Sequence, residues 1–577
     1  MLMQLPGRVA NRAATGDFRF GVLVAATAIA VYLVLVTELL SGLGILTAFY
    51  IAVAWIIPVV VGLWIAPHML RRRVARPPWP IWVVLAGLAL LLLLILTTGL
   101  ASAPNNYDSM TYHLPRVMHW LQSESVAHYY TPISRQLYQP PFAEYAIAHV
   151  ISLTRTDRFA FLVQWLALLG GAVGVSVIAR QLGCGPVGQA LAATIFVTAP
   201  IAILQGSSTQ NDLVVTFWIV VVVVAALDSP RDRWFRCLLA GGAIGLALLT
   251  KGTAWILLAP FVVWLAVDMV RKHRRSAIVP FAAAALIAVG LNAPHAYRNV
   301  ETFGSPFGNE EHGYFNDEFG FGVLVSNASR NVALEVSGSV AESSVRRLHD
   351  LIGLDPEDPK TTWPETRFQP DFNLLEDSAP NPLQVLLFVA AILTGAWIRD
   401  RRRTGYLVAV ATSFLIFSEA LRWQPWHSRL LLPLIALMAA WTASVLPRTE
   451  RSFYSLIAVG LVIAGCAAAL VNESRPLVGH DSVLTSDRTE DVFLHRPELR
   501  RTYLLAAKQL RHCKRVAVGL SDNFSWEYPM WPLLRAGVFG DVQLVVVPKA
   551  RGRPCSAVID AKGVTATGAR RESGPSR

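Results

Sequence analysis

The residues best suited to chemistry in this sequence are acids and bases that stand where long apolar segments end. Asp108 is the first of them: it opens a polar stretch, Asn105–Tyr145, that is rich in histidine and tyrosine. A loop that only joins two membrane helices does not need this concentration of ionisable and aromatic groups. We predict that Asp108 is a working carboxylate; the alternative is an acid at a membrane edge that has no functional role.

A second acid ends the turn Gln205–Asp212, directly before another apolar segment. Asn211 and Asp212 are both residues that cap helices, which is one interpretation of this turn. The other is that Asp212 faces Asp108 and completes an acceptor site or a divalent-metal site. Carboxylate oxygens suit Mg²⁺ or Mn²⁺, so a metal bound by Asp108 and Asp212 stays open at this stage.

Two basic segments indicate an anion-binding site. Lys251 lies in the run Gly245–Gly252, and a lysine at membrane depth is a functional candidate unless it only extends from the membrane edge into water. Arg429 opens a predicted helix, where a phosphate would meet both a guanidinium group and a helix N-terminus. We predict that Lys251, Arg429 and Arg422 bind phosphate. For Arg422, an ion pair with Glu419 is the alternative.

The segment that follows Asp108 has the pattern of a helix lying in the membrane interface. Apolar residues recur three and four positions apart in Ser109–Gln122, which predicts a short amphipathic helix. This helix would hold His113 and Arg116 over the membrane surface, where they could contact a substrate. His113 and His119 are six residues apart and do not share a helix face, so they do not predict a zinc site.

The rest of the chain has the composition of a membrane-embedded frame. Of its 577 residues, 54% are hydrophobic and only 16% are charged, and the mean hydropathy is +0.44. Apolar stretches that can cross a bilayer as helices recur, so we predict an α-helical polytopic membrane protein with about 13 transmembrane helices. The predicted spans are 19–41, 46–66, 80–101, 158–179, 189–205, 212–227, 235–250, 253–270, 277–296, 382–398, 404–421, 429–446 and 453–471.

Lysine and arginine gather in the segments that join alternate predicted helices, among them 71–73, 231–236, 271–275, 399–403 and 448–451. This asymmetry predicts a multi-pass protein of the cytoplasmic membrane with its N-terminus in the cytoplasm and its C-terminal tail outside. The polar stretches named above then all lie on the outer face. The net charge of +12 is explained by these clusters, so we do not predict binding to nucleic acid.

The predicted organisation has five parts. They are 1–79, with two helices and a basic loop; 80–296, the catalytic membrane module with an outer loop at 102–157; 297–381, a long and partly ordered outer loop; 382–471, the last helices; and 472–577, an outer tail. In the tail, a helix over 497–514 and short buried strands at 516–520, 542–547 and 556–559 predict a small α/β domain that ends in a disordered segment. Cys513 and Cys555 could form a disulfide if the tail lies outside.

Several of these motifs, in this order, resemble the GT-C superfamily of membrane glycosyltransferases, in particular its protein mannosyltransferase-like and lipid A aminoarabinose transferase-like branch, family 39-like. The resemblance covers roughly 80–450. The motifs are Tyr107-Asp108, Asn211-Asp212, Gly245–Gly252, Arg298-Asn299 with Phe303–Pro306, and Arg429 with Pro433. Two differences stand out: two extra helices precede the one that leads into the outer loop, and Asp108 has no adjacent second acid.

The resemblance implies transfer of a sugar from a polyprenyl-phosphate donor to an acceptor hydroxyl of the cell envelope on the outer face of the membrane. Asp108 would be the base or acceptor-orienting carboxylate, Asp212 its partner, and Lys251 with Arg429 would hold the donor phosphate. The predicted substrate-binding residues are Tyr107, His113, Arg116, Asn211, Arg298 and His427. The alternatives are a flippase or transporter of lipid-linked sugars, which commonly shows internal repeats that we do not find, and a non-catalytic envelope assembly protein.

Overall fold

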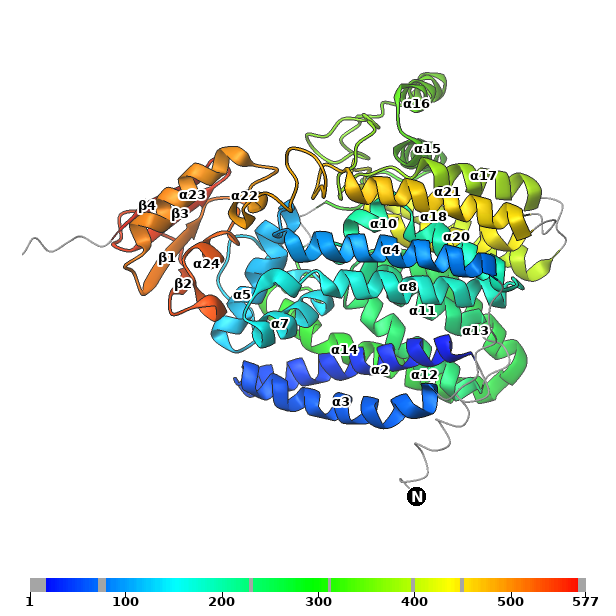
Figure 1. Ribbon diagram of the computed structural model, residues 1–577, viewed down its shortest axis with the longest axis horizontal. Coiled ribbons are helices and arrows are strands. Elements are labelled where there is room, and N and C mark those ends of the chain that lie inside the picture. The colour runs from blue at the N-terminus through cyan, green and yellow to red at the C-terminus, as the bar shows by residue number, and fades with distance from the viewer. Residues whose placement is uncertain are drawn as a thin grey trace, which may run out of the picture.

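The computed structural model describes residues 17–70, 79–227, 232–309, 313–395, 400–446 and 451–568. These residues form a bundle of helices with a small α/β unit at one end (Figure 1). The helices of the bundle are α2 (Phe18–Gly42), α3 (Ala48–Leu70), α4 (Trp79–Ala101), α8 (Leu162–Gln181), α9 (Pro186–Val197), α10 (Pro200–Gln205), α11 (Asp212–Leu227), α12 (Arg233–Leu248), α13 (Ala254–His273), α14 (Ile278–Phe303), α17 (Pro382–Gly395), α18 (Arg401–Ala420), α19 (His427–Leu430), α20 (Leu432–Val445) and α21 (Arg451–Leu470).

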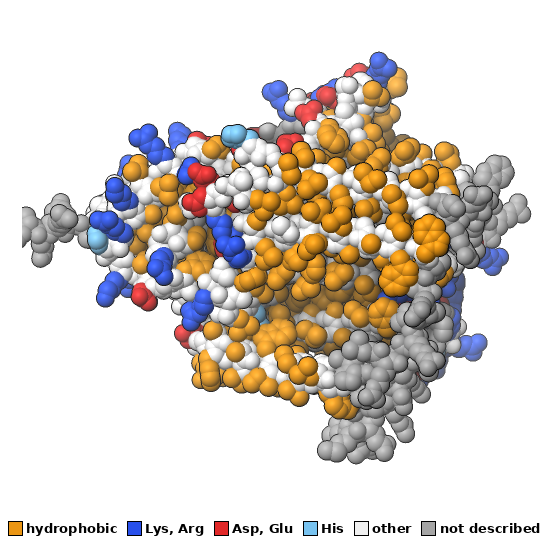
Figure 2. All heavy atoms as spheres, in the orientation of Figure 1, with side chains coloured by type: hydrophobic (Ala, Val, Ile, Leu, Met, Phe, Trp, Pro, Cys, Tyr) orange, Lys and Arg blue, Asp and Glu red, His pale blue; other side chains and the backbone are white. Residues whose placement is uncertain are grey.

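The bundle has the surface of a membrane protein. Large hydrophobic side chains cover its flank, whereas charged side chains gather on the α/β unit and at the ends of the bundle (Figure 2). Among the described residues, five helical stretches are long and apolar enough to cross a membrane: Phe18–Gly42, Ile81–Ala101, Asp157–Gln181, Ala254–Phe303 and Phe453–Leu470. Six further apolar helices are shorter.

The prediction of about 13 spans is therefore confirmed only in its coarser form, a largely helical membrane protein. Every predicted span overlaps a helix, but several of these helices are broken or short. The span predicted at 189–205 is divided into α9 and α10, because Pro200 has no backbone N–H to continue the first helix. Of the predicted basic clusters, residues 71–73 and the single arginines Arg231, Arg399 and Arg448 lie outside the described residues.

The segments that were predicted to form outer loops contain short helices. After α4 the chain forms a π-helical turn, η2 (Ser109–His113), then α5 (Leu114–Ser123), α6 (Arg135–Tyr138) and α7 (Phe142–Thr154). The predicted amphipathic helix is thus present as η2 and α5, although most of its side chains are buried against other parts of the protein. The long loop predicted from 297 to 381 contains the end of α14, α15 (Phe321–Val336) and α16 (Ser339–Ile352).

The C-terminal unit contains the predicted small sheet. Its helices are α22 (Arg488–Val492), α23 (Pro497–Leu510) and α24 (Met530–Leu533). The strands β1 (Arg515–Leu520), β2 (Gln543–Val546) and β3 (Ser556–Asp560) lie close to their predicted ranges, and β4 (Gly563–Thr567) was not predicted. The sheet order is β2-β1-β3-β4, with β1 parallel to β2 and β3, and β4 antiparallel to β3. Cys513 and Cys555 form a disulfide with their Cα atoms 5.8 Å apart.

The C-terminal unit is docked directly on the polar segment that follows α4. Glu527 is buried and hydrogen-bonds to His119 (2.6 Å) and to the side-chain amide of Gln136 (2.8 Å). The backbone N–H of Tyr528 donates to the carbonyl of Met110 at 3.0 Å. The predicted working segment is therefore packed between the helix bundle and the C-terminal unit (Figure 1).

Candidate active site

Asp108 lies between α4 and the π-helical turn η2, and its side chain is buried against two arginines. Its carboxylate is 2.7 Å from Nη2 of Arg429 and 3.7 Å from Nη1 of Arg135. A π-helical turn is rare and is often found at functional sites. Burial alone would raise the pKa of Asp108, but the positive charges of Arg429 and Arg135 outweigh it and lower the pKa from 3.8 to about 2. Asp108 is therefore held in its ionised form.

Arg429 binds a second carboxylate that the sequence analysis did not single out. Its Nη1 is 2.9 Å from Oδ1 of Asp377, which also accepts a hydrogen bond of 2.9 Å from the side chain of Gln210. Burial raises the pKa of Asp377 to about 6, and the nearby Glu376 and Asp108 add to this, although Arg429 opposes it. Of the two carboxylates that Arg429 contacts, Asp377 is therefore the more easily protonated.

Asp212 and Lys251 form the second ion pair of the site. Asp212 starts α11 and Lys251 follows α12, and Nζ of Lys251 is 2.5 Å from Oδ1 of Asp212. The side chain of Asn211 donates to the carbonyl of Thr250 at 3.1 Å, which holds the two segments together. Burial lowers the pKa of Lys251, and Asp212 only partly compensates. Oδ2 of Asp212 is buried and has no hydrogen-bond partner in the part of the chain that the structure describes.

The two ion pairs belong to one electrostatic cluster. The negative charges of Asp108, Asp377 and Asp212 together keep the pKa of Arg429 well above its ordinary value, although burial acts the other way. The cluster, which we call the charge cluster, contains three acids and three bases and therefore has no net charge when all are ionised. Its members are Asp108, Asp212, Asp377, Arg135, Lys251 and Arg429.

Tyr107 extends the charge cluster towards the C-terminal unit. Its hydroxyl accepts a hydrogen bond from Arg135 (3.0 Å) and donates one to the carbonyl of Asn523 (3.0 Å). Arg135 donates to the same carbonyl at 3.1 Å. The guanidinium group that faces Asp108 is therefore also in contact with the C-terminal unit.

His113 and Arg116 lie behind Asp108 and hold the polar segment in shape. Both are buried, and both contact Glu144 on α7: Nδ1 of His113 at 2.6 Å and Nη1 of Arg116 at 3.4 Å. Arg116 also donates to the backbone carbonyls of Leu137 and Gln139. These contacts tie α5 to α6 and α7. Both residues therefore support the shape of the segment that carries Asp108, and among the described residues neither has a hydrogen bond or ion pair with the charge cluster.

Three further predicted binding residues lie outside the charge cluster and have other partners. Arg298 binds Glu38 through two hydrogen bonds of 2.8 Å and the hydroxyl of Tyr145 at 2.7 Å. Arg422 pairs with the exposed Asp317, which lies between α14 and α15. His427 is fully buried and contacts the side chain of Asn331. Its Nδ1 is 2.9 Å from the side-chain oxygen of Asn331 on α15.

The arrangement of the carboxylates does not fit a divalent metal. Each acid of the charge cluster faces a lysine or arginine, and a cation cannot approach Asp108 or Asp212 without displacing these groups. Within the described ranges, no group of three or more His, Cys, Asp and Glu residues is close enough to hold a metal ion. The groups present instead suit an anion, because Arg429 and Lys251 can exchange their carboxylate partners for phosphate oxygens.

Comparisons with known proteins bear on the fold of the chain. A family model described as dolichyl-phosphate-mannose-protein mannosyltransferase matches residues 138–297, which include Asp212 and Lys251 but neither Asp108 nor Arg429. The structure of ArnT from Cupriavidus metallidurans in the apo state superposes with a TM-score of 0.52 at 16% identity, over 81% of this chain and 86% of that one. ArnT from the same organism bound to undecaprenyl phosphate gives a TM-score of 0.51 at 15% identity, over 80% and 85%. A comparison with curated protein sequences gave no match.

The fold and the position of the charge cluster define a class: a polytopic helical membrane protein with a buried acid–base site at one end of its bundle. The chain shares its overall fold with the two ArnT structures, and the mannosyltransferase model matches one part of it, residues 138–297.

Proposed function

We propose that the protein is a membrane glycosyltransferase that moves a sugar from a polyprenyl-phosphate donor to an acceptor hydroxyl at the outer face of the cytoplasmic membrane. The observation that carries the proposal is the charge cluster, in which two candidate phosphate ligands, Arg429 and Lys251, are paired with two candidate catalytic carboxylates, Asp108 and Asp212. Undecaprenyl phosphate, the lipid bound in one ArnT structure, has the chemistry that this cluster would recognise.

When the donor binds, its phosphate would compete with the acids of the charge cluster for Arg429 and Lys251. A carboxylate with a pKa of about 2 is a weak base near neutral pH, so Asp108 cannot take a proton efficiently while Arg429 holds it. A phosphodiester that binds Arg429 and Lys251 replaces the carboxylates as their partner. Asp108 then loses its strongest stabilising charge, and its pKa rises towards the range in which it can accept a proton.

Once Asp108 is released from Arg429, the transfer step can proceed. The acceptor oxygen attacks the anomeric carbon, the bond from that carbon to the phosphate oxygen breaks, and the acceptor proton passes to Asp108. Polyprenyl phosphate leaves with the bonding electron pair, and Arg429 and Lys251 bind the negative charge that develops on it. Asp212 lies beside Lys251 and orients it. A single direct attack inverts the configuration at the anomeric carbon.

The distribution of basic residues supports this orientation in the membrane. The helix ends remote from Asp212 and Lys251 carry many of the arginines and lysines of the chain, including Arg233, Arg271, Lys272, Arg274, Arg275, Arg401, Arg402 and Arg403. Such residues favour the cytoplasmic side. The charge cluster and the C-terminal unit, residues 472–577, would then face outward, where the acceptor is an envelope glycan, lipid or protein.

The test is transfer of a radiolabelled sugar by the purified protein in detergent. Polyprenyl-phosphate donors with different sugars are offered together with glycan, lipid and serine-containing peptide acceptors, and labelled product is counted. The proposal expects labelled acceptor and released polyprenyl phosphate in equal amounts. Donor binding without transfer to any acceptor, combined with movement of the donor across a proteoliposome membrane, would instead identify a flippase.

A further inference from the structure

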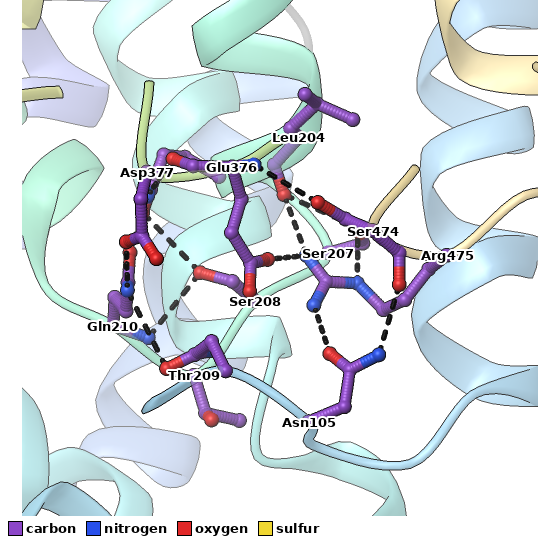
Figure 3. Close-up of polar contacts among 12 residues, drawn as sticks. Asn105, Leu204, Ser207, Ser208, Thr209, Gln210, Glu376, Asp377, Ser474 and Arg475 are labelled. Carbon is purple, nitrogen blue, oxygen red and sulfur yellow. Dashed lines mark hydrogen bonds and ion pairs between the residues drawn. The ribbon is translucent and has the colours of Figure 1, made fainter. Parts of the chain in front are cut away.

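A further buried ion pair, outside the charge cluster, lies close to it. The guanidinium group of Arg475, at the start of the C-terminal unit, pairs with the carboxylate of Glu376 in the segment before α17 (Figure 3). Their side chains are 2% and 3% exposed. A charge pair so far from water is costly to desolvate and is retained only where its geometry and hydrogen bonds are good. The proposed reaction does not use either residue.

The fork of Arg475 joins segments that are far apart in the sequence (Figure 3). Nη1 donates to the side chain of Asn105 at 2.8 Å, Nη2 to the carbonyl of Leu204 at 3.0 Å, and Nε to the hydroxyl of Ser207 at 3.2 Å. The side chain of Asn105 in turn donates to the carbonyl of Ser474 at 2.8 Å. Arginine can make these contacts together because its five N–H groups point in fixed directions.

Each segment that Arg475 binds also carries an acid of the charge cluster. Asn105 stands three residues before Asp108 on the segment that leads out of α4. Ser207 stands in the turn that ends at Asp212. Glu376, the carboxylate partner of Arg475, directly precedes Asp377, which is the third acid.

The three segments are also bonded to each other. The side chain of Gln205 donates to the carbonyl of Glu376 at 2.8 Å, and that of Gln210 donates to Asp377 at 2.9 Å. The hydroxyls of Ser109 and Thr209 are 2.6 Å apart, which joins η2 to the turn. These contacts form a junction of the three segments, and the junction sets the distances between the three acids.

We propose that Arg475 and Glu376 are positioning residues that hold Asp108, Asp212 and Asp377 at the spacing in which Arg429 and Lys251 can pass between carboxylates and a donor phosphate. The inference rests on the proposed transferase function and extends it. It also makes the start of the C-terminal unit a working part of the active site. A displacement of about 1 Å at a reacting group can lower a rate roughly 100-fold, so loss of this junction should act on kcat.

The experiment compares Arg475→Gln, Arg475→Lys and Glu376→Gln with wild type in the full-length protein. The matched control is Arg236→Gln: Arg236 is also buried and binds two carbonyls, of Ala225 and Ala226, and one carboxylate, of Asp268, but at the far ends of α11 and α12. For each variant, the folded fraction, the melting temperature, kcat, and the KM for the donor and for the acceptor are measured.

We expect Arg475→Gln to lower kcat per folded molecule roughly 100-fold while the donor KM changes by less than about threefold. Arg475→Lys keeps the charge but loses the fork and should recover only part of this loss. Glu376→Gln, which keeps the shape of the side chain, should also lower kcat even if Arg475→Gln does not fold. In the control variant, Arg236→Gln, we expect a lower melting temperature and an unchanged kcat.

Two results would overturn the inference. One is an unchanged kcat per folded molecule in Arg475→Gln and Glu376→Gln, which would make the pair purely structural. The other is an equal loss of kcat in the control, which would show that any buried arginine has this effect. In both cases wild type still transfers sugar. Failure of wild type to transfer sugar from any donor would instead refute the proposed function itself, and this inference with it.

Discussion

Replacement of Asp108 by asparagine would separate the two tasks that we propose for the charge cluster, proton transfer and donor binding. Asp108→Asn keeps the size of the side chain but removes the negative charge that is 2.7 Å from Arg429. The variant can no longer accept a proton from the acceptor. It also leaves Arg429 with only Asp377 as a carboxylate partner among the described residues, so the guanidinium group is more available to a phosphate. We therefore expect slower transfer together with donor binding that is unchanged or tighter.

The magnitudes follow from the shifted pKa. A change from 3.8 to about 2 corresponds to roughly 2 kcal/mol in favour of the ionised form. Because the pKa is lowered, this contribution stabilises the folded protein above pH 3.8 and is lost as the pH falls through 2. At neutral pH, Asp108→Asn should lower the free energy of unfolding by up to roughly 2 kcal/mol, and donor affinity could rise by up to about 30-fold. Loss of the base should slow transfer by about 10²–10⁴-fold.

The assay measures transfer of labelled sugar at saturating donor, donor binding at equilibrium, and the melting temperature, in parallel with Asp317→Asn. Asp317 is an exposed acid between α14 and α15 that pairs with Arg422, so its replacement controls for the loss of one negative charge. Equal transfer by Asp108→Asn and wild type would remove this carboxylate from the mechanism. Donor binding that weakens in step with transfer would refute the idea that the acid competes with the phosphate for Arg429.

Three further outcomes are expected. Lys251→Gln should lower kcat/KM for the donor about 10–100-fold, because a charge-assisted hydrogen bond to the phosphate is lost, and steady-state kinetics with varied donor checks this. Since Asp377 has a pKa of about 6, it is protonated and releases Arg429 as the pH falls below that value, so donor affinity measured between pH 7.5 and 5.5 should rise; Asp377→Asn should bind donor tightly throughout and lose this dependence. Cys513→Ser opens a loop closed by the disulfide to Cys555 across a sequence separation of 42 and should destabilise the C-terminal unit by about 4 kcal/mol, which denaturant titration of the oxidised wild type and the variant would show.

The sequence was most informative where local patterns decide the structure. The strands β1, β2 and β3 and the helix α23 lie close to their predicted ranges because each is marked by a short apolar run or a helical period between polar residues. The edge strand β4 has the residues Gly-Val-Thr-Ala-Thr and offers no such run. The number of membrane spans is harder to predict, since length and hydropathy do not separate a short helix packed in the bundle from one that crosses the bilayer.

For the candidate site, the sequence indicated residues but not their pairing. Asp108, Asp212, Lys251 and Arg429 were all predicted to act together, with the two acids facing one another. In the structure each acid faces a base, because a buried charge is stabilised mainly by an opposite charge and two adjacent buried carboxylates repel each other. Their catalytic and binding roles remain predictions, as do those of the residues that lie further away.

Asp377, Glu376 and Arg475 could not have been selected from the sequence. Asp377 is one of many acids in the long polar segment 297–381, and Arg475 is one of many arginines in the tail. Their importance depends on contacts across more than 90 residues, such as the pair Arg475–Glu376 and the hydrogen bond from Arg475 to Asn105. No local period or motif carries information about contacts of that kind.

A largely buried cluster of acids and bases without net charge would also keep the proposed base inactive until the substrate binds. A free carboxylate with a normal pKa beside a lipid-linked sugar could activate water as readily as an acceptor hydroxyl. In the structure Arg429 holds Asp108 in a weakly basic state, and on our proposal this lasts until an anion competes for that guanidinium group. The group that activates Asp108 would then be the phosphate of the donor, so basicity would appear only in the complex that has a sugar to transfer.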